Sequence, residues 1–262
     1  MGVTVRGAIA VALRSVYLSL LTNHFLQTLV TQLFHHYYYA ASVDANARDR
    51  PVWTRTNWLG VSVLKCPFDL WTYQEIIRES ALDIILETGT AAGGSALFLA
   101  SICQLVGRGR VITIDTQHKG DLPKNDRITY IKGSSVDQRV IEQVASSIEP
   151  GDRVMVILDS NHSIDHVKRE LELYSQFVTE NSYIIVEDTN LNGHPVMRAH
   201  GPGPMEAVRE FLHTNNDFVI DRNREKFYLT FNPCGYLRRV TKLGPPLSGA
   251  RDYDQLVRHD CT

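Results

Sequence analysis

The sequence "ILETGTAAGGSALFLA", residues 85–100, joins a strand-like segment to a helix-like segment through a run of glycines. An apolar run leads into an acid, Glu87, and Gly89, Gly93 and Gly94 follow before a segment with apolar residues at helical spacing. Glycines permit a tight turn and a close approach of the backbone to a ligand, and the N-terminus of a following helix favours negative charge. The pattern predicts a ligand-binding turn between a strand and a helix. A glycine turn needed only for packing is the alternative.

The segments after this turn alternate between strand and helix patterns. Strands are expected at 83–89, 110–116, 127–134, 152–160 and 182–189, and helices at 94–106, 136–148, 163–180 and 204–215. Two more strands, expected at 217–222 and 226–233, are close enough along the chain to form an antiparallel pair. The alternation predicts an α/β, Rossmann-like fold. Its doubly wound sheet is mostly parallel, has helices on both faces and ends in an antiparallel C-terminal strand.

Acidic or small polar residues stand at four of the expected strand ends. They are Glu87-Thr88-Gly89, Asp115, Asp159-Ser160-Asn161-His162 and Glu187-Asp188. In an open parallel sheet, ligands bind at the carboxyl ends of the strands, near the switch in strand order. A carboxylate at the end of a buried strand is costly unless it reaches water or a partner. Four such ends on one edge of the sheet therefore predict a functional site.

The glycine spacing indicates which cofactor this edge would take. It reads G-x-x-x-G-G rather than the G-x-G-x-x-G of dinucleotide enzymes, and Glu87 would repel a phosphate. S-adenosylmethionine fits better, because it combines a cationic centre, a ribose diol and a carboxylate. Asp115 ends the second strand, where an acid usually binds the ribose hydroxyls. The predicted cofactor-binding residues are Glu87, Thr88, Gly89, Gly93, Ser95, Asp115, Ser135 and Asp159.

Asp159, Glu187 and Asp188 end two strands expected to be adjacent, so their carboxylates could meet at one point. Mg²⁺ prefers oxygen ligands, and no cysteine shares these strand ends, which disfavours a softer metal. The alternative is that Glu187 and Asp188 pair with arginines such as Arg198, or cap a helix.

Three histidines follow these strand ends. His162 lies three residues after Asp159, and imidazole titrates near neutrality, so His162 is the predicted catalytic base beside Asp159. It could instead cap the next helix or bind Asp159. His194 is the competing base, and His166 is expected to be structural. Three glycines and three prolines between 188 and 204 favour an ordered surface loop over the pocket, with an inert connection as the alternative.

Five separated motifs carry a resemblance to a known family. "NWLGVSVLKCPFDLWTYQEII" (57–77), "ILETGTAAGGSALFLASI" (85–102), "VITID" (111–115), "LDSNHSIDHVKREL" (158–171) and "YIIVEDTNLNGHPV" (183–196) are similar to the cephalosporin hydroxylase family. That family is related to the rhamnosyl and macrolide-sugar O-methyltransferases. The resemblance implies a class I methyltransferase fold that binds S-adenosylmethionine, with Mg²⁺ held by Asp159, Glu187 and Asp188. It spans about 57–240.

Composition limits the partners. The 262 residues carry a formal net charge of −2 and no long basic run, so nucleic-acid binding is not indicated. The four cysteines are far apart, which favours a reducing, cytoplasmic location. Near the N-terminus, the apolar run between Arg6 and Arg14 is too short to span a bilayer. An amphipathic packing helix is expected there, with weak membrane-surface contact as the alternative.

The predicted organisation has three parts. Residues 1–56 form a helical extension, 57–240 the methyltransferase domain and 241–262 a tail. Three tyrosines, Tyr37 to Tyr39, follow an apolar segment, and we expect part of 1–50 to form a homo-oligomer contact. The predicted function is Mg²⁺-dependent O-methylation of a hydroxyl on a small molecule, a natural product or a sugar. A non-catalytic S-adenosylmethionine-binding or assembly protein and an iron-dependent oxygenase are the alternatives.

Overall fold

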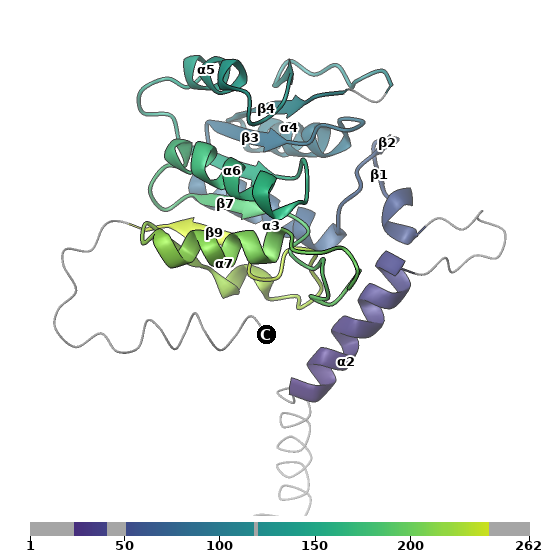
Figure 1. Cartoon of the computed structure of the whole chain (residues 1–262). Coiled ribbons are helices and arrows are strands. Elements are labelled where there is room, and N and C mark those ends of the chain that lie inside the picture. The colour runs from purple at the N-terminus through teal and green to yellow at the C-terminus, as the bar shows by residue number, and fades with distance from the viewer. Residues whose placement is uncertain (1–23, 41–50, 118–119, 241–262) are drawn as a thin grey trace, which may run out of the picture.

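A seven-stranded sheet with helices on both faces forms the body of the protein (Figure 1), and the computed structural model describes residues 24–40, 51–117 and 120–240. The strand order is β5-β4-β3-β6-β7-β9-β8. The first five strands in that order are parallel, and β9 runs antiparallel to both of its neighbours. The strands are β3 (Ile84–Thr88), β4 (Arg110–Asp115), β5 (Ile128–Lys132), β6 (Val154–Leu158), β7 (Tyr183–Val186), β8 (Phe218–Ile220) and β9 (Tyr236–Arg239).

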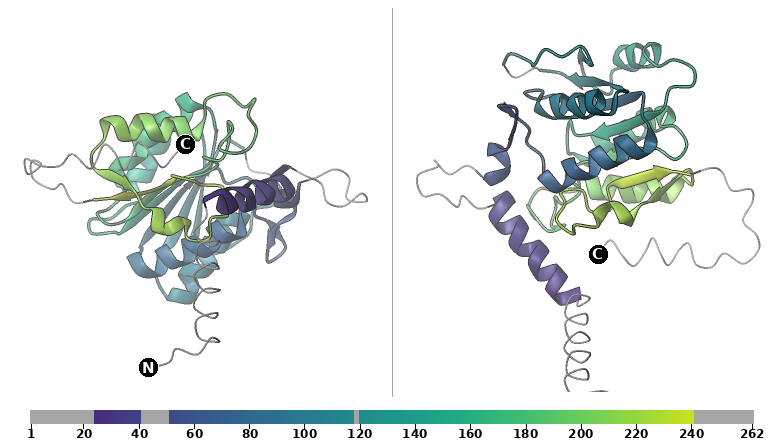
Figure 2. Two further views of the ribbon diagram at one scale, coloured as in Figure 1. Left: turned by 90° about the horizontal axis from the view of Figure 1, so that it is seen from below. Right: turned by 180° about the vertical axis from the view of Figure 1, so that it is seen from behind.

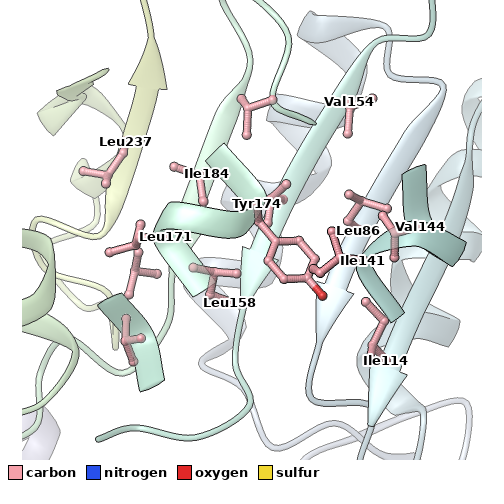
Figure 3. Close-up of a cluster of buried hydrophobic side chains, with 14 of the residues drawn as sticks. Leu86, Ile114, Ile141, Val144, Val154, Leu158, Leu171, Tyr174, Ile184 and Leu237 are labelled. Carbon is pink, nitrogen blue, oxygen red and sulfur yellow. The ribbon is translucent and has the colours of Figure 1, made fainter. Parts of the chain in front are cut away.

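The four helices expected after the glycine turn lie where the apolar periodicity predicts them, and together with α3, which the periodicity did not predict, they cover the two faces of the sheet (Figures 1 and 2). One face packs on α5 (Gln138–Ser146), α6 (Ile164–Tyr174) and α7 (Pro204–Thr214), the other on α3 (Pro67–Ser80) and α4 (Gly94–Val106). Both faces are buried, so the central strands are mostly apolar. Along β3, Ile84 and Leu86 join the first core, and Ile85 joins the second. Figure 3 shows Leu86 within the first core.

The predicted α/β, doubly wound architecture is confirmed, with one wrong strand. Residues 226–233 do not form a strand, and the second strand of the antiparallel pair is β9 at Tyr236–Arg239. An apolar side chain of this segment packs in the core instead of joining the sheet. Phe231 is buried among aromatic side chains, and its N–H donates to Asp69 Oδ2 at 2.9 Å. Tertiary packing, rather than sheet pairing, explains the pattern.

A helical segment precedes the sheet. Helix α2 (His24–Phe34) continues into a π-helical stretch, η1 (His35–Ala40), and η2 (Val52–Arg55) leads to a short hairpin of β1 (Asn57–Trp58) and β2 (Val61–Ser62). Residues 1–23 and 241–262 lie outside the described ranges, and so do the predictions made for them. Among the described residues, no helix has the length and apolar character that a membrane span requires.

The tyrosines after α2 differ in their exposure to solvent. Tyr39 is buried and stacks on Trp53, with ring centroids 5.4 Å apart, whereas Tyr37 is exposed. Helix α2 also exposes apolar side chains, which are Phe25, Leu29, Val30 and Leu33. The homo-oligomer contact stays a prediction.

Candidate functional site

The glycine turn follows β3 and opens α4 at the carboxyl edge of the sheet. Gly89 has φ +92° and Gly93 has φ +79°, which is the left-handed region that favours glycine. A Cβ on Gly89 would overlap the carbonyl oxygen of Asp159, and one on Gly94 would overlap that of Ser62. These glycines are therefore required by the packing of this edge, as well as by the shape of the turn. The turn lies beside β6, at the switch in strand order where such sheets bind ligands.

Glu87 is fully buried beneath this turn and only partly satisfied. Its Oε2 accepts the Thr113 hydroxyl at 2.7 Å, whereas Oε1 accepts no hydrogen bond of standard geometry from the described residues. Burial raises the pKa of Glu87 to about 7, although Lys65, Ser95 and Thr113 act in the opposite direction. A buried carboxylate with a spare oxygen is suited to a cationic ligand.

Asp115 ends β4 and connects the second strand to the glycine turn. Its Oδ2 accepts the N–H of Ala91 at 2.8 Å, and its Oδ1 accepts the N–H of Gln117 at 3.0 Å. Thr88 is buried, and its hydroxyl accepts the N–H of Asp159 at 3.2 Å. The predicted cofactor residues of β3, β4 and β6 thus share one edge of the sheet.

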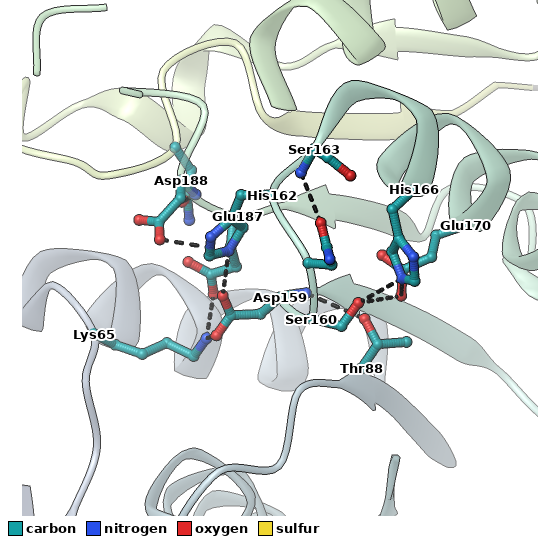
Figure 4. A network of polar contacts seen from close by, with 12 residues as sticks. Lys65, Thr88, Asp159, Ser160, His162, Ser163, His166, Glu170, Glu187 and Asp188 are labelled. Atoms are coloured by element: carbon teal, nitrogen blue, oxygen red, sulfur yellow. Dashed lines mark hydrogen bonds and ion pairs between the residues drawn. The ribbon is translucent and has the colours of Figure 1, made fainter. Parts of the chain in front are cut away.

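A cluster of carboxylates and one imidazole lies at the ends of β6 and β7 (Figure 4). His162 Nε2 is 3.3 Å from Asp159 Oδ1 and 3.5 Å from Asp188 Oδ2. Asp159, His162 and Asp188 form the one group among the described residues whose ligand atoms are close enough together to hold a metal ion. Two of the three predicted metal ligands are therefore adjacent, with the predicted base between them.

Glu187 is not part of that group. It is buried, its Oε1 accepts the Tyr73 hydroxyl at 2.5 Å, and the same atom is 2.8 Å from Lys65 Nζ. Its neighbour Asp188 turns the chain with φ +56°, a conformation that Asp adopts more readily than most residues. The Asp188 N–H donates to Asn232 Oδ1 at 3.0 Å. This turn directs two successive carboxylates to different partners.

Lys65 is the residue of this site that sequence reasoning missed. Its side chain is 2% exposed, and its Nζ lies 2.5 Å from Asp159 Oδ2. Burial alone would lower the pKa of Lys65, but Asp159, Glu187 and Glu87 outweigh it and hold the pKa well above its ordinary value. The alternative in which Arg198 neutralises Asp188 is not observed, since no described residue forms an ion pair with Arg198.

The environment of His162 favours a charged ring. Burial would lower its pKa, but the hydrogen bond to Asp159 and the charges of Asp188 and Asp159 raise the pKa to about 9. Burial raises the pKa of Asp188 to about 7, with His162 opposing. The competing base, His194, is directed elsewhere, because its Nε2 is 3.0 Å from Glu206 Oε1 on α7.

A second polar network supports the loop after β6. The Ser160 hydroxyl donates to Glu170 Oε1 at 2.7 Å and lies 3.0 Å from His166 Nε2 (Figure 4). The hydroxyl of Ser135, a predicted cofactor residue, is 3.1 Å from the same nitrogen. His166 is thus engaged with neighbouring side chains, as expected of a structural residue.

A groove of about 810 Å³ runs between α2 and the loop after β7. Its aromatic wall is formed by Tyr39 and Trp53, and Val196 and Met197 line the loop side. Burial raises the pKa of Tyr39, and the charges of Asp188 and Asp159 add to this effect. In the 188–204 loop, Thr189 and Asn190 are fully buried and residues 197–200 are exposed.

Comparison with known proteins identifies the family. The family profile described as rhamnosyl O-methyltransferase/CmcI matches residues 50–240. A rhamnosyl O-methyltransferase of Mycobacterium tuberculosis (strain ATCC 25618 / H37Rv) is 36% identical over 218 residues, covering 80% of this chain and 85% of the relative. The one from Mycobacterium leprae (strain TN) is 36% identical over 220 residues, covering 80% of this chain and 90% of the relative.

The structural comparison agrees on the fold. A solved structure of CmcI with Mg and SAM has a TM-score of 0.57 and 19% sequence identity, and the match covers 80% of this chain and 95% of that one. The resemblance read from the motifs is thereby confirmed, and the matched region contains the whole sheet and the carboxylate cluster. The chain belongs to the rhamnosyl O-methyltransferase/CmcI family and is an S-adenosylmethionine-dependent methyltransferase.

Proposed function

We propose that this methyltransferase transfers the methyl group of S-adenosylmethionine to a sugar hydroxyl of a small molecule, at a site that requires Mg²⁺. The carboxylate–histidine cluster carries the proposal, because two carboxylates and one imidazole lie together on the same edge of the sheet as the glycine turn. The sugar acceptor is supported by the relatives, which are named rhamnosyl O-methyltransferases. Incubation with a set of glycosides, followed by mass spectrometry of the products, tests the acceptor class.

The donor set of the cluster fits Mg²⁺. Asp159 Oδ1 and Asp188 Oδ2 are oxygen ligands on adjacent strand ends, and oxygen ligands are what Mg²⁺ prefers. Asp159 and Asp188 would hold the ion, and Glu187 remains a predicted third ligand although its Oε1 is engaged by Tyr73 and Lys65. When bound, the ion supplies positive charge that stabilises the developing alkoxide of the acceptor.

His162 would remove the proton from the acceptor hydroxyl. Its Nε2 faces the two carboxylates, so a hydroxyl positioned at the cluster lies within reach of the imidazole. Only the neutral imidazole of His162 can accept a proton. The carboxylates of Asp159 and Asp188 favour the charged imidazole unless a cation neutralises these carboxylates. Much of the rate would come from aligning the acceptor oxygen with the methyl carbon at a separation of roughly 3 Å.

Glu87 supplies a test of cofactor binding. We expect Glu87→Gln to weaken the binding of S-adenosylmethionine by roughly 10- to 100-fold, because a buried charged hydrogen-bond acceptor is lost while the shape is kept. Isothermal titration calorimetry measures this directly. The exposed Glu142 on α5 provides the control, since Glu142→Gln should leave the affinity unchanged. An unaltered affinity in the Glu87 variant, or a preference for NAD in the wild type, would contradict the assignment.

The groove along α2 would take the acceptor. Trp53 and Tyr39 present a stacked aromatic wall to this groove, and aromatic faces bury large areas against apolar surfaces. We expect Trp53→Ala to raise the KM for the acceptor by roughly tenfold while the affinity for S-adenosylmethionine stays the same. Steady-state kinetics with the acceptor varied will show this. Trp71→Ala, at an exposed site on α3, is the matched control. A loss confined to kcat would argue against acceptor binding at Trp53.

The cluster disfavours the competing functions. An iron-dependent oxygenase typically uses two histidines and one carboxylate, whereas this cluster contains one histidine and two carboxylates. A non-catalytic protein would have no need to retain Glu87, Asp159 and His162 on one edge. The cytoplasmic location and the homo-oligomer stay predictions from the sequence.

A further inference from the structure

Lys65 is a buried cation at the centre of the carboxylate site. It precedes α3, outside the strand–helix alternation, and its side chain is 2% exposed. Its Nζ contacts one oxygen of Asp159, from the end of β6, and one oxygen of Glu187, from the end of β7 (Figure 4). A buried ammonium group is tolerated only when it is well paired. The two ion pairs therefore fix both carboxylates as well as the lysine.

Lys65 and His162 contact different oxygens of the carboxylate cluster. Lys65 contacts Asp159 Oδ2, while Asp159 Oδ1 and Asp188 Oδ2 face His162. The oxygens available to a metal thus lie on the His162 side of Asp159, and the lysine lies on the other side. The three carboxylates share the site with Lys65 and with His162, which lies on the opposite side of Asp159 from the lysine. Lys65 therefore already neutralises part of the charge that a divalent cation would otherwise neutralise.

We propose that Lys65 is a positioning residue that holds Asp159 and Glu187 in place in the metal-free enzyme and, by its charge, keeps the affinity for the divalent cation low. The inference rests on the proposed metal site. A fixed positive charge beside a divalent ion repels it strongly at low dielectric. Asp159 and Asp188 already face the same point beside His162, so these two ligands need no rearrangement when the ion enters or leaves.

Lys65→Met should lower the stability of the metal-free protein and raise its affinity for a divalent cation. Without metal, Asp159 and Glu187 lose the lysine that pairs with both of them and repel each other more strongly, so the variant should be less stable than the wild type. With metal, the repulsion between the lysine and the ion is gone, so the variant should bind Mn²⁺ more tightly, by roughly tenfold or more. A lysine that served only as scaffold would weaken metal binding when removed, because the ligands would move.

Mn²⁺ binding to the full chain, measured by electron paramagnetic resonance, tests the proposal without an activity assay. Lys65→Met and Lys65→Gln should both bind Mn²⁺ more tightly than the wild type, and Lys65→Arg, which keeps the charge, should not. The melting temperatures of Lys65→Met and Lys65→Gln should be low in EDTA and should recover when Mn²⁺ is added. Lys168→Met is the matched control, because Lys168 is partly exposed on α6 and pairs with Glu210.

The outcomes separate this inference from the proposed function. Wild-type protein that binds no Mn²⁺ would overturn the metal site and the role of Lys65 together. Wild-type binding with equal or weaker binding by both uncharged variants would overturn the role of Lys65 alone. Variants that stay unfolded in Mn²⁺ would also contradict it, because the ion should replace the missing charge.

Discussion

Asp188→Asn should reduce Mg²⁺-dependent methyl transfer by roughly 10²–10³-fold, as expected when one preorganised electrostatic contributor is lost. Asn keeps the size of the side chain and tolerates the left-handed backbone at this position, where φ is +56°. The substitution therefore removes a charge rather than the turn. Binding of S-adenosylmethionine should stay almost unchanged, because Glu87 and Asp115 are on other strands.

Steady-state kinetics measure the loss of methyl transfer, and calorimetry on the same preparations measures the affinity for S-adenosylmethionine. Asp165→Asn, at an exposed position in the first turn of α6, should behave as wild type in both measurements. Full turnover by Asp188→Asn without added Mg²⁺ would rule out a metal role for this carboxylate. A parallel loss of cofactor binding would instead indicate that Asp188 belongs to the cofactor site.

His162→Ala should slow methyl transfer by roughly 10²–10⁴-fold at neutral pH, the usual contribution of a general base. The carboxylates raise the pKa of His162 to about 9 in the absence of metal. A cation between Asp159 and Asp188 would counteract them, so in Mg²⁺ the wild-type rate should rise with pH through a pKa below about 9. The defect of the variant should shrink at high pH, where the acceptor hydroxyl ionises without help.

A pH–rate profile for both enzymes measures this difference. His213→Ala, at an exposed position near the end of α7, is the control and should follow the wild-type profile. If His162→Ala retained full activity at neutral pH, the base would have to be another group. His194 would be a poor substitute, because its ring pairs with Glu206.

The sheet and its functional edge follow from local sequence patterns. Buried parallel strands are continuously apolar, as in "VMVIL" of β6, and each is followed by a helix with apolar spacing. The position of Asp159 and Asp188 follows from this alternation, because parallel strands place their carboxyl ends on one edge. Their closeness to His162 follows in turn from the short connection into α6.

The parts that sequence reasoning missed depend on contacts between distant segments. Lys65 stands in "VSVLKCPFDLW", where nothing marks it as buried, and its partners Asp159 and Glu187 are about a hundred residues away along the chain. Tyr73 on α3 likewise holds Glu187 through a contact that no local pattern indicates. Residues 226–233 have strand-like apolar spacing, yet Phe231 packs on Tyr39 instead of joining the sheet.

Transfer of a labelled methyl group from S-adenosylmethionine to a rhamnoside, measured with EDTA and then with excess Mg²⁺, decides whether the site needs the ion. We expect transfer to stop in EDTA and to return when Mg²⁺ is restored, because Asp159 and Asp188 would hold the ion that stabilises charge on the acceptor oxygen. Transfer at the same rate in EDTA as in Mg²⁺ would contradict the requirement for the ion.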